Sequence, residues 1–198
     1  MRRTREEAEQ TRLRVIAAAL KLFSRNGYSQ TTLAMIAAEA GYSRGPIYWH
    51  FRNKDELFEA VLGYSQQPLL ALVERARREP DPRRAVDGFV DEWFRLLIED
   101  DWYRQSFEIL LNKTELTDAM VRTIRREREI TRAIVTTLGA RIHELAPAGD
   151  ADAGSLGLLC YTFLMGITQS WLFAPQLFSL AERRAFFTAR LERMLGLA

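Results

Sequence analysis

The sequence predicts an all-α protein of about nine helices. Apolar residues recur at three- and four-residue spacing along most of the chain, and Ser, Thr, Asp or Asn stands where several of these segments begin. No convincing alternation of apolar and polar residues indicates a strand. A chain of 198 residues with 47% hydrophobic composition can hold a small domain joined to a larger one.

The first segment, residues 1–8, is charged and is expected to be a flexible basic arm. Its arginines could enter a DNA minor groove, and a solvated tail is the alternative. These arginines are Arg2, Arg3 and Arg5. An amphipathic helix is predicted over about 9–26, ended by Asn26 and Gly27. Its inward-facing residues are Leu13, Ile16, Ala17, Leu20 and Phe23.

Residues 31–51 predict two short helices joined by a glycine turn, a helix-turn-helix. The first helix begins after a Thr N-cap and ends at Gly41, which tolerates a positive φ. Its buried side carries Leu33, Ile36, Ala37 and Ala40. Ser43 is expected to cap the second helix, which buries Ile47 and Phe51 at i and i+4.

The outer face of the second helix carries Gly45, Tyr48 and Trp49, which suits a DNA groove better than open solvent. Arg44 can pair with guanine or with a phosphate, and the neighbouring ring donors suit phosphate oxygens. Lys54, at the start of the next helix, can also reach a phosphate. A helical hairpin with aromatic packing is the alternative. The expected DNA-facing residues are Thr31, Thr32, Tyr42, Ser43, Arg44, Gly45, Tyr48, Trp49, His50 and Lys54.

The charge of the chain is distributed unevenly. Residues 1–54 carry ten Lys/Arg and four Asp/Glu, whereas the remainder is net −4. A basic N-terminal part followed by a mildly acidic remainder is expected when only the N-terminal part binds a phosphate backbone. We therefore predict a DNA-binding domain over 1–53 and a larger helical domain over 54–198.

The larger domain is expected to contain six helices. A helix that opens at Asn53 and is kinked by Pro68 should join the two domains. The expected spans are 53–78 and about 86–98, 102–112, 114–145, 151–173 and 180–195. Residues 153–181 hold no charged side chain, so the helix at 151–173 must be covered on every side. We expect it to form a homodimer four-helix bundle with the last helix; a monomer core and a membrane span are the alternatives.

The sequence offers little for an enzyme. His50 and His143 are far apart, and neither metal-ligand spacing, a nucleophile elbow nor a phosphate loop is present. We therefore expect no enzymatic activity, no cofactor and no metal. The single cysteine, Cys160, lies in an apolar run and fits a reducing cytosol, and no signal peptide is evident, so a cytoplasmic location is expected.

The segment 15–62 closely resembles the N-terminal domain of the tetracycline-repressor (TetR) family. The similarity is carried by Gly27-Tyr28, Thr31-Thr32, Ile36-Ala37, Ala40-Gly41, 45–51 and 53–57. Residues 2–9 and 108–120 look like the branch that regulates multidrug efflux pumps. The resemblance implies a homodimeric repressor that binds a palindromic operator, contacts phosphate through Lys54 and is released by a small molecule. An activator, or a regulator of lipid or aromatic metabolism genes, stays open.

The larger domain is rich in aromatic residues with few polar anchors, which suits a hydrophobic ligand. Plain core packing is the alternative for each of them. Similarity to the efflux-regulator branch implies that Phe107, Leu111, Met165 and Gln169 face a pocket. That branch often has polar residues at the first three of these positions, so this pocket is expected to be more apolar. The complete expected set is Phe94, Trp102, Phe107, Leu111, Phe163, Met165 and Gln169.

Overall fold

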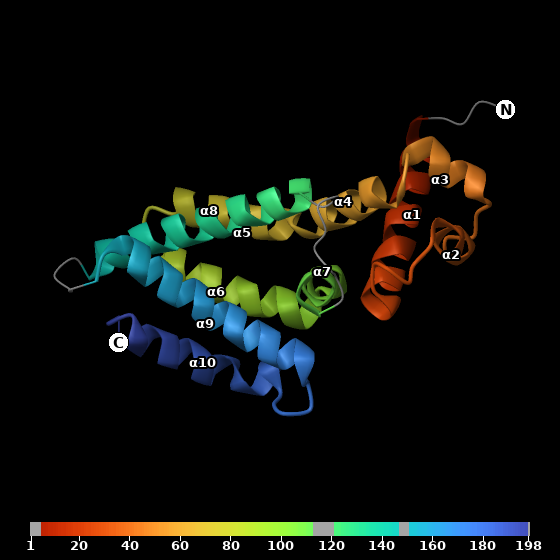
Figure 1. The fold of residues 1–198 in the computed structure, drawn as a ribbon. Helices are drawn as coiled ribbons and strands as arrows, with labels where there is room; N and C mark the ends of the chain where they lie inside the picture. The colour runs from red at the N-terminus through yellow and green to blue at the C-terminus, as the bar shows by residue number, and fades with distance from the viewer. Residues whose placement is uncertain (1–4, 113–120, 147–150, 198) are drawn as a thin grey trace. The chain divides into compact units, whose positions relative to one another are not determined.

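The computed structural model describes residues 5–112, 121–146 and 151–197 (Figure 1). This part of the chain forms ten α-helices and no strand, which confirms the all-α prediction. The helices are α1 (Arg5–Asn26), α2 (Leu33–Glu39), α3 (Arg44–His50), α4 (Lys54–Ser65), α5 (Gln67–Arg78), α6 (Pro82–Glu99), α7 (Asp101–Asn112), α8 (Val121–Leu145), α9 (Ala153–Phe173) and α10 (Leu180–Met194).

The chain divides into two compact units. The first unit consists of residues 1–66 and 102–124, and the second of residues 67–101 and 125–198. The first unit therefore extends past the expected domain boundary at residue 53, because α4 and α7 pack into its core as well. Buried side chains from α4, such as Leu57 and Phe58, and Ile109 from α7 belong to that core.

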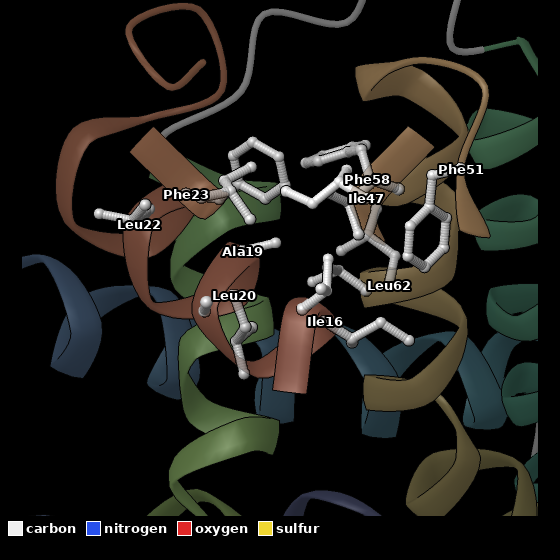
Figure 2. Packing of buried hydrophobic residues seen from close by; sticks show 14 of the residues in the cluster. Ile16, Ala19, Leu20, Leu22, Phe23, Ile47, Phe51, Phe58 and Leu62 are labelled. Atoms are coloured by element: carbon white, nitrogen blue, oxygen red, sulfur yellow. The ribbon is translucent and has the colours of Figure 1, made fainter. Parts of the chain in front are cut away.

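The core of the first unit is built around α1. Ile16 and Phe23 of α1 point toward Ile47 of α3 and Phe58 of α4 (Figure 2). The rings of Phe23 and Phe58 meet edge to face, with centroids 5.3 Å apart. Such aromatic pairs add about 0.5–1.5 kcal/mol to the free energy gained by burial. The central position of α1 thus joins α2, α3 and α4 around one core. The first unit is called the head below.

The single helix expected over 53–78 is wrong, since the structure breaks it into α4 and α5. The backbone N–H of Gln66 donates to the Leu62 carbonyl at 2.9 Å and closes α4. Pro68 has no N–H with which to continue the ladder, and it lies in the first turn of α5, where proline is tolerated. With this break, the described residues form ten helices where about nine were expected.

The N-terminal helix begins earlier than the sequence predicted. The flexible arm was expected to reach residue 8, whereas α1 already begins at Arg5, so residues 5–8 are helical. Glu6 and Glu7 lie in the first turn, where carboxylates favour a helix start. Arg2 and Arg3, and the expected helix start at Thr114, lie outside the described residues.

In the second unit, α8 and α9 approach closely through two glycines. A Cβ atom added to Gly157 of α9 would overlap the Val135 carbonyl oxygen of α8, and one added to Gly139 would overlap the Ala153 carbonyl oxygen. The close contact of Gly157 is therefore made within one chain. At Gly166, farther along α9, an added Cβ would meet no atom within 4 Å.

Polar contacts also join the helices of the second unit. The indole N–H of Trp93 on α6 donates to the Thr168 hydroxyl of α9 at 3.1 Å, and both side chains are buried. The Arg141 guanidinium of α8 donates to the carbonyls of Ala76, Arg77 and Glu79 at the end of α5, at 2.6–3.1 Å. These carbonyls have no partner within the helix, so Arg141 supplies the donors that the end of α5 needs.

Candidate nucleic-acid interface

The two faces of α3 differ sharply in burial. Ile47 and Phe51 are buried in the core of the first unit, as expected. Tyr48 and Trp49 are 57% and 72% exposed. Large aromatic side chains at this exposure gain little from the protein itself, which indicates a surface made for contact with another molecule.

The exposed surface of α3 continues through its first turn. Arg44 and Gly45 are both exposed, and an added Cβ at Gly45 would meet no atom within 4 Å. Core packing therefore does not require a glycine at this position. Because Gly45 has no side chain, the backbone itself is exposed on the outer face of α3. A flat helical surface flanked by Arg, Tyr and Trp donors can approach the edges of base pairs.

The turn before α3 follows the expected pattern. Thr32 is the N-cap of α2, and its hydroxyl oxygen accepts a hydrogen bond from the Met35 N–H at 3.2 Å. Gly41 adopts a φ of +74°, the left-handed conformation that ends α2. Ser43 occupies the N-cap position of α3, but among the described contacts its hydroxyl makes no capping hydrogen bond, contrary to expectation.

Thr31 is the expected DNA-facing residue that the structure moves to the interior. It is fully buried, and its hydroxyl donates to the carbonyls of Gly27 at 2.8 Å and Leu22 at 3.2 Å. Thr31 therefore secures the turn after α1, and its side chain is not accessible to a nucleic acid. A pair of adjacent threonines in the sequence does not reveal which of them is buried.

Lys54 lies at the start of α4 against Tyr28. Its ammonium donates to the Tyr28 carbonyl at 2.9 Å and lies 4.1 Å from the centroid of the Tyr28 ring. The Tyr28 hydroxyl donates to Asp55. Burial, together with the Asp55 carboxylate, raises the pKa of Tyr28 above its ordinary value, so the hydroxyl stays a donor. These contacts hold the Lys54 side chain in one orientation at the head's surface.

Tyr42 and His50, the residues close to the two ends of α3, are both half-buried. The His50 ring lies edge to face with that of Trp49, with centroids 4.6 Å apart. The Tyr42 hydroxyl lies 3.4 Å from a guanidinium nitrogen of Arg14 on α1. Arg14 was not expected at this surface, because no local sequence pattern links residue 14 to residue 42.

The residues expected to line a ligand pocket are divided between the two units. Three of them, all at least half-buried, lie on α7 in the first unit: Trp102, Phe107 and Leu111. Four lie in the second unit, where Phe94 of α6 is fully buried and three α9 side chains are half-buried: Phe163, Met165 and Gln169. Their assembly into one pocket stays a prediction.

A carboxylate of α7 joins that helix to α1. The Glu108 carboxylate of α7 accepts a hydrogen bond from the Ser24 hydroxyl of α1 at 2.6 Å. Ile109, the next residue, is fully buried in the core around α1. Glu108 therefore helps to hold α7 against α1 in the first unit. This contact joins residues 84 positions apart in the chain, so no sequence pattern predicted it.

Comparison with known proteins agrees with the helix-turn-helix. Residues 15–61 match the family model described as bacterial regulatory proteins, tetR family. The chain is 35% identical to the HTH-type transcriptional regulator TtgR of Pseudomonas putida over 88% of this chain and 86% of TtgR. It is 30% identical to the HTH-type transcriptional regulator AcrR of Shigella flexneri, over 98% of this chain and 93% of AcrR.

The fold also matches solved structures. The crystal structure of NalD from Pseudomonas aeruginosa aligns with a TM-score of 0.80 and 25% identity, covering 96% of this chain and 97% of that one. The sequence similarity to TtgR extends well beyond the helix-turn-helix, through most of both chains. The chain belongs to the tetR family of bacterial regulatory proteins.

Proposed function

We propose that this protein is a transcriptional repressor that binds a palindromic operator as a homodimer and releases it when a hydrophobic small molecule binds. The observation that carries the proposal is the outer face of α3, where Tyr48 and Trp49 are exposed while Ile47 and Phe51 anchor the helix from behind. A regulator of this kind acts in the cytoplasm and needs no catalytic group or cofactor.

The DNA contacts divide into base-reading and phosphate-binding groups. Arg44, at the exposed start of α3, reads a base edge, and Gly45 lets the backbone approach the groove. The remaining donors bind phosphate and set the register of the protein on the duplex. The proposed contact residues are Thr32, Tyr42, Ser43, Arg44, Gly45, Tyr48, Trp49, His50 and Lys54. They lie within or beside the proposed DNA-binding domain, 1–53.

Residues 54–198 are proposed to bind the ligand and to form the dimer. α9 is long and apolar enough to cross a membrane by length and composition, with a mean hydropathy of 1.4, and only 28% of that stretch is buried in one copy. Phe173 of α9 is 78% exposed, and Leu158 of α9 and Phe186 and Met194 of α10 are also exposed. Burying apolar surface contributes about 25 cal/mol per Å², so a second copy on α9 and α10 accounts for this face.

The effector is proposed to be hydrophobic. Its contacts are Phe94, Trp102, Phe107, Leu111, Phe163, Met165 and Gln169, of which only Gln169 is polar. An apolar lining with few polar anchors favours a large apolar ligand. A dimer binds the operator only when its two recognition helices lie at the spacing of the half-sites. A ligand that binds more tightly to the dimer at another spacing therefore releases the DNA.

An efflux pump is the proposed target. NalD is the secondary repressor of the MexAB-OprM multidrug efflux pump in Pseudomonas aeruginosa. A repressor released by hydrophobic compounds links the presence of such compounds to a pump that exports them. Expression of neighbouring transporter genes should therefore rise in cells that lack this protein.

The first experiment is selection from a random-sequence duplex library on the purified protein. A two-fold symmetric consensus should emerge, because two identical heads read two half-sites. Arg44→Ala should weaken binding to the recovered duplex and relax base preference in one position of each half-site. No enrichment over several rounds at low salt would refute DNA recognition.

A second experiment tests the dimer. Light scattering without detergent should give twice the 22.8 kDa of one chain. A monomer at micromolar concentration would refute the dimer, and a protein that stays in solution only with detergent or lipid would favour a membrane-associated role for α9.

A further inference from the structure

The surface around α3 includes an arginine from α1. Arg14 is exposed, and one of its guanidinium nitrogens lies 3.4 Å from the hydroxyl oxygen of Tyr42, the residue immediately before the α3 N-cap. α1, the turn that holds Tyr42 and α3 all belong to the first unit, so this contact lies within the DNA-binding head. α1 thus delivers a cation to the end of the helix that is proposed to read bases.

The charge of Arg14 is not neutralised within the described part of the chain. Its neighbours one turn away on α1 are uncharged: Gln10, Thr11, Ala17 and Ala18. α2, the turn and α3 contain one carboxylate, Glu39, and this pairs with Lys21 at 2.5 Å. Arg12, by contrast, has Glu9 at 3.7 Å. Arg14 is therefore the α1 cation near α3 that can accept a new anion without giving up an ion pair.

The chemistry of the guanidinium indicates the kind of anion. Its planar set of five N–H donors matches the oxygens of a phosphodiester, and one donor directed at Tyr42 leaves the others for a ligand. The Tyr42 hydroxyl keeps the long side chain beside α3, which lowers the entropy lost when an anion binds. A DNA phosphate next to the bases read by α3 fits this position.

We propose that Arg14 binds a DNA backbone phosphate beside the half-site, as a further contact from α1 that supplements those of α2, α3 and α4. The proposal rests on DNA binding by the head. Arg14 carries no base preference in this role, and it adds affinity and fixes the register of α3 in the groove.

The test measures the salt dependence of binding to the duplex recovered by selection on the parent protein. Fluorescence anisotropy titrations at several salt concentrations compare the parent with Arg14→Gln, Arg14→Lys and Arg25→Gln. Arg25 is the matched control, because it is an exposed arginine in the last turn of the same helix. Circular dichroism melting curves verify that every variant folds like the parent.

Arg14→Gln should weaken binding on the order of tenfold, since hydrogen bonds to charged groups contribute strongly. It should also reduce the slope of log K against log salt by about 0.9 for each protomer in the complex. Arg14→Lys should retain the parental slope, because a lysine preserves the charge. Arg25→Gln should leave both quantities unchanged.

Three outcomes would overturn the phosphate contact. In the first, Arg14→Gln has the parental affinity and slope. In the second, it weakens binding at the parental slope, which would limit Arg14 to supporting Tyr42. In the third, it reduces the slope no more than Arg25→Gln does. In each case the parent still binds the selected duplex, so the proposed function survives. Failure of the parent to select any duplex would overturn both proposals.

Discussion

Replacing Gly157 with alanine should destabilise the second unit, whereas the same replacement at Gly88 should stabilise it. Both glycines lie within helices, α9 and α6. An added Cβ at Gly88 would meet no atom within 4 Å, but at Gly157 it would overlap the Val135 carbonyl and lie 2.9 Å from the Gly139 nitrogen. These obstacles are backbone atoms, so no side chain can rotate away.

The paired design isolates the cost of this overlap. Alanine is favoured over glycine within a helix by about 0.8–1.0 kcal/mol, and this gain is shared by both sites. Forcing an extra carbon into a packed contact costs about 1–3 kcal/mol. Gly157→Ala should therefore be less stable than Gly88→Ala by about 1–3 kcal/mol. For a chain of this length that corresponds to a Tm difference of roughly 2–12 °C.

Thermal and urea unfolding followed by circular dichroism measure the two differences independently. Gly88→Ala should melt above the parent and Gly157→Ala below Gly88→Ala by the stated amount. Gly139→Ala should behave like Gly157→Ala, because its added Cβ would meet the Ala153 carbonyl. Equal Tm values for Gly157→Ala and Gly88→Ala would show that α8 and α9 are not in backbone contact, and the reasoning would fail.

Three further substitutions address other parts of the molecule. Lys54→Ala should weaken binding to all duplexes and lower the salt slope; a parental slope in anisotropy titrations would remove Lys54 from the phosphate contacts. Phe173→Asp should shift the protein toward monomer, because a charge then replaces the most exposed large apolar side chain of α9. An unchanged mass by light scattering would exclude the α9 face from the dimer interface. Arg141→Ala should cost roughly 1.5–3 kcal/mol of unfolding free energy, since three carbonyls of the α5 end lose their charged donor, and an unchanged urea midpoint would contradict this.

Much of the DNA-binding head could be predicted from the sequence because its signals are local. A cap such as Thr32, a positive-φ glycine such as Gly41, and an i, i+4 pair such as Ile47 and Phe51 each act within one or two turns of helix. The exposed face of α3 followed from the same spacing. The break between α4 and α5 also has a local cause, but a proline such as Pro68 can either kink one helix or begin another, so the sequence does not distinguish the two.

Contacts between distant segments were not accessible in this way. Two adjacent threonines have equal capping propensity, and only packing buried Thr31 while leaving Thr32 at the surface. Likewise, nothing in the sequence connects Arg14 with Tyr42, or Glu108 with Ser24.

The amino-acid sequence by itself determined the all-helical class, the helix-turn-helix and the chemistry of its outer face, because helix periodicity, capping and turn conformation depend on neighbouring residues. Only the tertiary structure decided that α7 joins the head, that Gly157 meets α8 of its own chain, and that Arg14 reaches the start of α3. The physical reason is that these contacts depend on how the helices pack, and packing joins side chains whose separation along the chain carries no periodic signal.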